Sequence, residues 1–189
     1  MILEMALFLA ALQDAPQEIS QAARDELVKL VTIKDDPLEP RITLTTERVA
    51  PDPEVGEELQ EYYFSMSVDR KTGVGSYFLS AYRFYSDRGI RFYTTLNYIG
   101  ADGPVSLQIV TADRKVLKCF HPLETCTFRE TFTVEIPQRD FLFLANSPAQ
   151  LEGWLFKYSA RSGTESRWFM LPAEAKALIS ASETLVLKK

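Results

Sequence analysis

The chain has 189 residues, of which 46% are hydrophobic and 25% are charged, and its formal net charge is −5. This length fits one globular domain. The excess of acids argues against a nucleic-acid-binding surface, which needs a basic field. No apolar run reaches the roughly 20 residues that cross a bilayer, so we expect no transmembrane span.

The first fifteen residues have the character of a secretory signal. An apolar run over residues 1–12 is followed by the polar Gln13 and Asp14, with small Ala10 and Ala11 just before them. Export signals end in this way. The run contains Glu4 and no lysine or arginine, which favours the alternative of an amphipathic helix end. The sequence therefore predicts a signal-like segment over 1–15 and a single β-rich domain over 16–189.

A helix is expected directly after this segment, because apolar residues recur at intervals of three and four from Ile19 to Leu30. Residues 34–37 end the helix. Residues 42–48 are predicted to form a strand. The following stretch, 49–58, is rich in proline and acid, which indicates a surface connection rather than a domain boundary.

Residues 61–99 contain 11 of the 22 aromatic residues of the chain, so we expect the core to be densest there. Polar and apolar residues alternate with a period of two, which predicts strands. We interpret the stretch as a three-strand antiparallel meander over 61–68, 76–86 and 90–99. This much aromatic surface cannot stay exposed, so the rest of the chain must cover it.

The second half of the chain continues the β pattern. Strands are expected at 105–111, 115–120, 126–136, 151–160 and 166–170. Residues 137–146 fit either a helical turn or a buried connection. Pro172 opens a short helix through Ile179, and residues 183–189 could add a terminal strand.

These elements predict a mainly β fold. We expect an antiparallel β-sandwich of about eight or nine strands, with an N-terminal helix and a short C-terminal helix. An open sheet covered by both helices is the alternative architecture.

Cys119 and Cys126 are the two cysteines of the chain, and they flank a predicted hairpin loop. Opposed positions on antiparallel strands come within reach of a disulfide, so we predict that the two are bonded. In that register Leu117 faces Phe128. A disulfide of this kind is typical of exported proteins.

Two alternatives remain for the cysteines. Together with His121 and Glu124 they could bind a metal ion, but the paired close spacings of a zinc site are missing. They could also be free thiols in a cytosolic protein. We expect no cofactor.

Glu130 interrupts an otherwise apolar line on the strand 126–136. A carboxylate that faces a core needs a partner or a raised pKa. It could serve as an acid or base in a pocket. The structural alternatives are a salt bridge with a residue such as Arg83, which we favour, or a bulge that turns the side chain outward.

Tyr63, Tyr82, Arg91 and Tyr93 form a candidate ligand platform, because rings and guanidinium groups stack on flat ligands. The alternative is that these residues form the partly solvent-exposed interior of a sandwich. Trp154 and Trp168 face each other across the last hairpin in one register, and we expect both in the core.

Catalytic motifs are missing from the sequence. A Ser-His-Asp or Cys-His arrangement would have only one histidine, His121, as its base. No nucleophile elbow, phosphate-binding loop, dinucleotide fingerprint or His-Glu-x-x-His motif occurs. A hydrolase that uses two carboxylates distant in sequence stays open.

Three stretches carry a resemblance to a known group of proteins: the cysteine hairpin with residues 126–134, the run 154–163, and Leu171-Pro172 with its short helix. They resemble the closing half of small exported envelope proteins and lipoproteins of proteobacteria that have no assigned function. The resemblance covers about a third of the chain. It implies export and β structure, and it carries over no catalytic residue. The lipid-attachment cysteine of the lipoproteins is missing near the N-terminal run.

The leading hypothesis is a non-enzymatic periplasmic or secreted β-sandwich that acts as a binding or envelope-associated module for an unknown ligand or protein partner. A carboxylate-dependent hydrolase that uses Glu130 is the second hypothesis. A cytoplasmic scaffold or partner subunit is the third.

Overall fold

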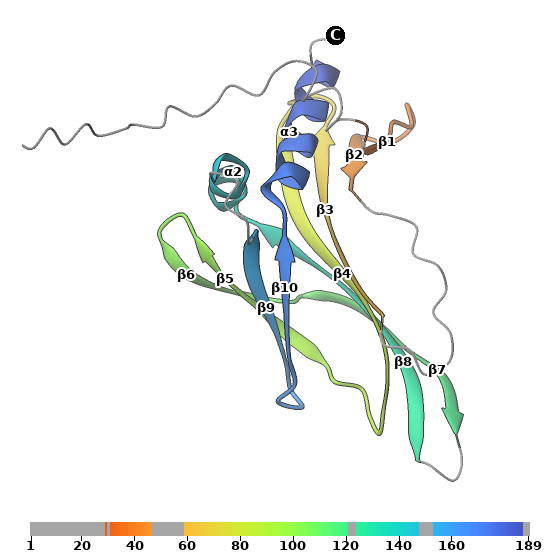
Figure 1. Ribbon diagram of the computed structural model, residues 1–189. Helices are drawn as coiled ribbons and strands as arrows, with labels where there is room; N and C mark the ends of the chain where they lie inside the picture. Colours follow the sequence, from red (N-terminus) through yellow and green to blue (C-terminus); the bar gives the residue numbers. More distant parts are fainter. Residues whose placement is uncertain (1–28, 30, 47–58, 121–123, 148–152, 187–189) are drawn as a thin grey trace, which may run out of the picture.

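The computed structural model describes residues 29, 31–46, 59–120, 124–147 and 153–186. Ten strands and two helices are present in this part of the chain. All strand pairs are antiparallel, and they form two sheets (Figure 1). Neither of the two helices has the length and apolarity needed to cross a membrane.

The larger sheet, sheet A, has six strands in the order β1-β2-β3-β4-β8-β7. Its strands are β1 (Thr32–Lys34), β2 (Arg41–Thr45), β3 (Leu59–Asp69), β4 (Gly75–Asp87), β7 (Thr111–Phe120) and β8 (Thr125–Ile136). Sheet B has the order β10-β9-β5-β6. Its strands are β5 (Tyr93–Gly100), β6 (Gly103–Gln108), β9 (Trp154–Ala160) and β10 (Glu165–Met170).

The β3–β4 hairpin confirms the first two strands of the predicted meander. On β3 the side chains alternate strictly between buried and half-buried positions from Tyr62 to Val68. The turn is closed by Asp69, whose carboxylate accepts hydrogen bonds from the backbone amides of Thr72 and Lys71. These bonds lower the pKa of Asp69. Gly73 supplies the positive φ of +73° that the turn requires.

The third strand of the meander was wrongly placed. β5 does not pair with β4, because β4 already has β3 and β8 as its two neighbours. The chain instead crosses to sheet B between Asp87 and Tyr93, and β5 pairs there with β6 and β9. Phe92 makes this crossing with a positive φ of +57°, which is uncommon for an aromatic residue.

Aromatic rings from the two sheets meet in one core. Tyr62 of β3 stacks on Tyr158 of β9 at 5.5 Å between ring centroids. Phe132 of β8 meets the same Tyr158 ring edge-on at 4.7 Å. Tyr93 of β5 lies 5.4 Å from Phe132. Rings of β3 and β8 in sheet A therefore pack against rings of β5 and β9 in sheet B.

The helices α2 (Gln138–Asn146) and α3 (Pro172–Val186) complete the core and contact each other. Phe141 of α2 stacks on Tyr77 at 4.4 Å and meets Phe64 edge-on at 5.2 Å. In its first turn, Asp140 accepts hydrogen bonds from the Tyr98 hydroxyl at 2.7 Å and from the Ala101 amide at 3.0 Å. A side chain at Gly100 would collide with this carboxylate, so the glycine is required.

Several predictions about the ends of the chain and the last hairpin differ from the structure. The predicted N-terminal helix was wrong at its end, because Thr32–Lys34 form β1; its main part and the segment 1–15 lie outside the described residues. The ambiguous stretch 137–146 is a helix, and α3 continues to Val186, where a terminal strand was considered. Trp168 pairs with Phe156 rather than Trp154 and is 38% exposed, so only Trp154 belongs to the core.

The predicted disulfide is present at the end of the β7–β8 hairpin, where Cys119 and Cys126 are direct cross-strand partners. The predicted pairing of Leu117 with Phe128 is wrong, because Val116 faces Phe128 and a bulge follows at Leu117. The hairpin end extends away from the other strands in Figure 1. Both sulfur atoms that the metal alternative needs are used by the bond.

Replacing Cys119 and Cys126 together by serine should lower the free energy of unfolding by about 2–3 kcal/mol, because the open chain gains conformational entropy when the short loop is released. Urea unfolding followed by circular dichroism measures this change. Near-ultraviolet spectra should remain native, since the core rings lie elsewhere. An unchanged midpoint would contradict a stabilising role for the bond.

Candidate functional site

Glu130 is fully buried and has a complete set of hydrogen-bond donors. Its carboxylate accepts from Nε of Arg114 at 3.0 Å and from the Tyr85 hydroxyl. The backbone amides of Phe92 and Tyr93 donate to it at 3.2 and 3.4 Å. Four donors from three segments of the chain therefore converge on one carboxylate.

The donors are themselves held in place. Arg114 also donates to the carbonyl oxygen of Tyr93 at 3.1 Å. The Tyr85 hydroxyl accepts from the Arg91 amide at 2.9 Å. Burial raises the pKa of Tyr85, and the neighbouring Glu130 carboxylate raises it further, so this hydroxyl keeps its proton for donation. The network fixes the crossing between the two sheets.

The predicted salt bridge of Glu130 is present, with a different arginine as its partner. Arg83 lies opposite Glu130 in the strand register, but it donates to Ser166 and, at 3.0 Å, to the Tyr62 hydroxyl. Arg114, on the other neighbouring strand, forms the ion pair. The sequence indicated that a carboxylate at this position needs a partner or a raised pKa, and it did not point to Arg114.

This arrangement removes the observation on which the hydrolase hypothesis rested. Acid–base hydrolysis of glycosides uses two carboxyl groups on either side of the substrate. Asp87 joins this network through the Arg91 guanidinium, which donates to it at 3.2 Å. Glu130 itself bonds to no other acid in the described part of the chain. Its donors leave no face of the carboxylate for a substrate.

The four residues of the candidate platform are not brought together. Tyr93 is fully buried in the core, and the Arg91 guanidinium lies over the Tyr85 ring at 4.1 Å. Tyr63 and Tyr82 do share the outer face of sheet A, where Tyr63 pairs with Ser80 and Tyr82 with Glu61. Only half of the predicted platform therefore lies on one surface.

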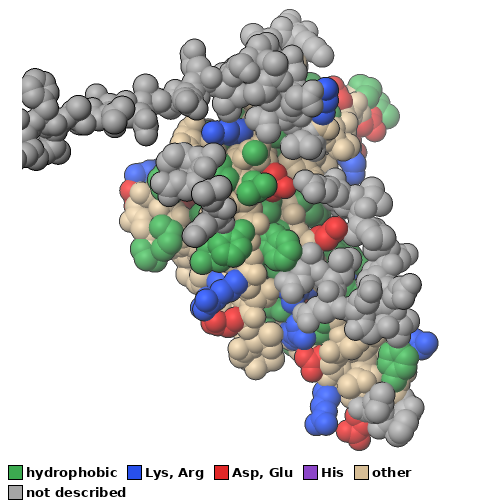
Figure 2. Space-filling model, in the orientation of Figure 1, with side chains coloured by type: hydrophobic (Ala, Val, Ile, Leu, Met, Phe, Trp, Pro, Cys, Tyr) green, Lys and Arg blue, Asp and Glu red, His purple; other side chains and the backbone are tan. Residues whose placement is uncertain are grey.

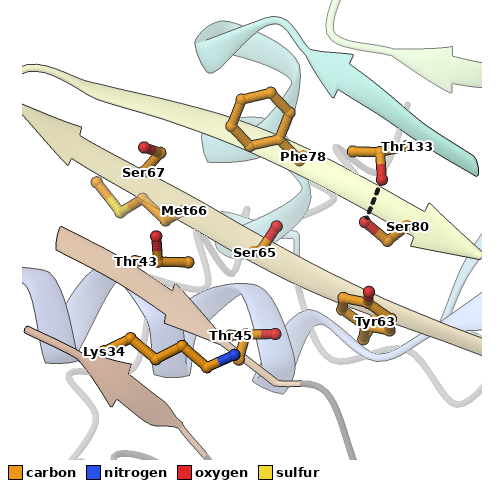
Figure 3. Close-up of a pocket in the computed structure, with 10 residues that line it drawn as sticks. All are labelled: Lys34, Thr43, Thr45, Tyr63, Ser65, Met66, Ser67, Phe78, Ser80 and Thr133. Atoms are coloured by element: carbon orange, nitrogen blue, oxygen red, sulfur yellow. Dashed lines mark hydrogen bonds between the residues drawn. The ribbon is translucent and has the colours of Figure 1, made fainter. Parts of the chain in front are cut away.

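The outer face of sheet A holds a different candidate site, a hollow of about 360 Å³ (Figure 3). Hydroxyl side chains dominate its lining. The lining residues are Lys34, Thr43, Thr45, Tyr63, Ser65, Met66, Ser67, Phe78, Ser80 and Thr133. We call this feature the hydroxyl hollow.

Strand register explains why the hydroxyls gather there. Thr43, Ser67 and Ser76 are cross-strand partners and form one row across three strands. A second row joins Thr32, Thr45, Ser65 and Phe78, and a third joins Tyr63, Ser80, Thr133 and Thr111. Because side chains alternate along a strand, these rows share the face opposite to the core.

Several of these groups are available to a ligand. Ser80 and Thr133 bond to each other at 2.9 Å. Within the described residues, the hydroxyls of Thr43, Ser65 and Ser67 have no protein partner, and all three are half-buried. In the part of the chain that the structure describes, no carboxylate lines the hollow, and the ammonium of Lys34 is its one charged group.

A second hollow of about 290 Å³ adjoins the first at Tyr63, which lines both. It lies between β3, β10 and the start of α3, and includes Trp168 with the carboxylates of Glu61 and Glu174.

Elsewhere the surface is mixed: on sheet B the exposed Leu155 and Phe169 are cross-strand partners, with the Lys157–Glu165 ion pair nearby. In Figure 2 hydrophobic side chains lie among polar and charged ones.

The sequence contains a signal for the hydroxyl hollow. In residues 61–69, serine alternates with large apolar residues, so one face of the strand must be rich in hydroxyls. The partner strands carry threonine and serine at matching positions. Their alignment into rows depends on register, which the sequence alone does not give.

No protein-family model matches the chain, and no curated protein or solved structure is significantly similar to it. Inference about function therefore depends on the geometry of this molecule.

We expect Glu130→Gln to lower the free energy of unfolding by about 3 kcal/mol, because it removes the negative charge and leaves the Arg114 guanidinium without its counter-ion. Glu135→Gln is the matched control, since Glu135 lies on the same strand and is exposed. It should change stability by less than about 0.5 kcal/mol. Equal urea midpoints for the two variants would contradict the structural role of Glu130.

Proposed function

We propose that the protein is a non-enzymatic binding module of an oxidising compartment, and that it holds its ligand in the hydroxyl hollow. The hollow itself carries this proposal: hydroxyl groups that have no partner among the described residues lie there with two aromatic rings on a sheet face. Pockets that bind small ligands combine apolar or aromatic walls with a few polar groups that orient the ligand.

The disulfide supports the choice of compartment, because such bonds persist in secreted and periplasmic proteins and are rare in the cytosol. The resemblance of the C-terminal third to envelope proteins agrees with it. The cytoplasmic scaffold hypothesis expected free thiols, and the described cysteines are bonded.

The proposal includes a sandwich arrangement of the two sheets. Tyr62 and Tyr158 stack between them, and Phe132 packs on the same ring. With one face of sheet A used for the core, its opposite face is left for binding. The strands that build the core thereby also position the hollow.

Ser65→Trp should abolish binding, because the indole would fill the hollow from its floor. The measurement is a screen of monosaccharides, dipeptides and small aromatic acids at millimolar concentration by amide chemical shifts of ¹⁵N-labelled protein. In the wild type we expect shifts at Ser65, Ser80 and Thr133 with at least one of these classes.

Ser106→Trp provides the matched control, because Ser106 is exposed on β6 of the other sheet. This variant should respond like the wild type. Shifts that cluster on sheet B, or no shifts with any compound class, would contradict the proposed site.

A further inference from the structure

We propose that the ligand of the hydroxyl hollow is a glycan chain that lies across the strands of sheet A. This inference rests on the proposed function and names the ligand class for the same site. It follows from the spacing of the hydroxyls, the position of the rings and the charge of the lining.

The hydroxyl rows run perpendicular to the strands. Adjacent strands in a sheet are about 4.7–4.9 Å apart, so a row presents one side chain at each such step. A pyranose repeat in a polysaccharide is of comparable length. A glycan laid along the row Thr43–Ser67–Ser76 or the row Tyr63–Ser80–Thr133 would therefore meet about one polar side chain per sugar.

Hydroxyl groups both donate and accept hydrogen bonds, and sugars need partners of both kinds. Thr43, Ser65 and Ser67 offer such groups, since none of them bonds to another described residue. A lipid tail in the same place would strip water from these hydroxyls without replacing their hydrogen bonds, at a cost in free energy. A lipid is therefore a poorer match.

Two rings stand at opposite sides of these hydroxyls. In Figure 3 the Phe78 ring leans toward β8 and the Tyr63 ring toward β2, with Ser65 and Ser80 between them. Phe78 is half-buried, and no ring in the described residues stacks on it. The apolar face of a pyranose packs well on an aromatic ring, as other flat groups do.

The charge of the lining also fits a glycan. The protein carries a net charge of −5, yet among the described residues no carboxylate lines the hollow. Glu135, which pairs with Phe78, is exposed beside it without lining it. Lys34 is the charged group among the described lining residues, so the lining suits both neutral sugars and sugars that bear a carboxylate.

A peptide strand is the less suitable occupant. Peptides that bind to sheets usually add a strand at an edge, where backbone groups are unpaired. Most of the residues that line the hydroxyl hollow lie on β2, β3 and β4, which are interior strands of sheet A, and Lys34 comes from the edge strand β1. Their backbone hydrogen bonds are already used within the sheet.

The experiment is a titration of ¹⁵N-labelled protein with cellohexaose, xylohexaose, chitohexaose and hexagalacturonate. We expect at least one hexasaccharide to shift the amides of Ser65, Ser67 and Ser80. Phe78→Leu and Tyr63→Leu should each weaken that binding by about tenfold, which is typical for the loss of one stacking ring.

Leucine keeps the positions apolar while it removes the ring, and amide spectra of the variants report whether they are folded. Phe143→Leu is the matched control, because Phe143 is an exposed ring on α2, away from sheet A's outer face. It should bind like the wild type.

Failure of this inference can be distinguished from failure of the proposed function. If no hexasaccharide binds but dipeptides or aromatic acids shift the outer-face amides, the glycan is wrong and the binding module stands. If a hexasaccharide binds the wild type and both ring variants equally well, the proposed stacking of sugars on Phe78 and Tyr63 is wrong. If nothing shifts these amides, both proposals fall.

Discussion

The carboxylate of Glu130 holds the two sheets in their relative positions. It lies on sheet A and accepts hydrogen bonds from the backbone amides of Phe92 and Tyr93, where the chain enters sheet B. The β9–β10 turn docks on the same segment, because the amides of Arg161 and Ser162 donate to the carbonyl oxygens of Phe92 and Arg91. A buried charge is tolerated only when its hydrogen bonds are complete, and here they are.

The two faces of sheet A carry different kinds of side chain. The inner face contains the charge network and the rings that pack against rings of sheet B and of α2. The outer face carries hydroxyls and the hydroxyl hollow. On β3 one alternating run supplies both, since Tyr62, Phe64 and Met66 face the core while their neighbours face outward. A slip of one residue would exchange the two sets, so core packing also fixes the candidate site.

Local pattern predicted most of the strands, the turn closed by Asp69 and the cysteine pair, because these depend on neighbours in sequence. The crossing at Phe92 was missed for a physical reason. Its positive φ is stabilised by hydrogen bonds to Glu130, 38 residues further along the chain. The pairing of Glu130 with Arg114 instead of Arg83 likewise depends on contacts between residues that are far apart in the sequence.

The candidate site shows the same limit. Aromatic composition suggested a platform of Tyr63, Tyr82, Arg91 and Tyr93, yet strand assignment puts Tyr93 in the core. Ring content does not say which face a ring occupies, whereas the alternation of serine with apolar residues on β3 does. The hydroxyl rows then follow from register, and register depends on which strands pair.

Hydrogen exchange of the Phe92 amide tests the central claim most directly. This amide bonds to the Glu130 carboxylate rather than to a ladder partner. If the carboxylate holds the sheets together, the amide should exchange only with global unfolding, with the same free energy of opening as the core amide of Phe132. Exchange of the Phe92 amide within minutes, while Phe132 stays protected, would contradict the account.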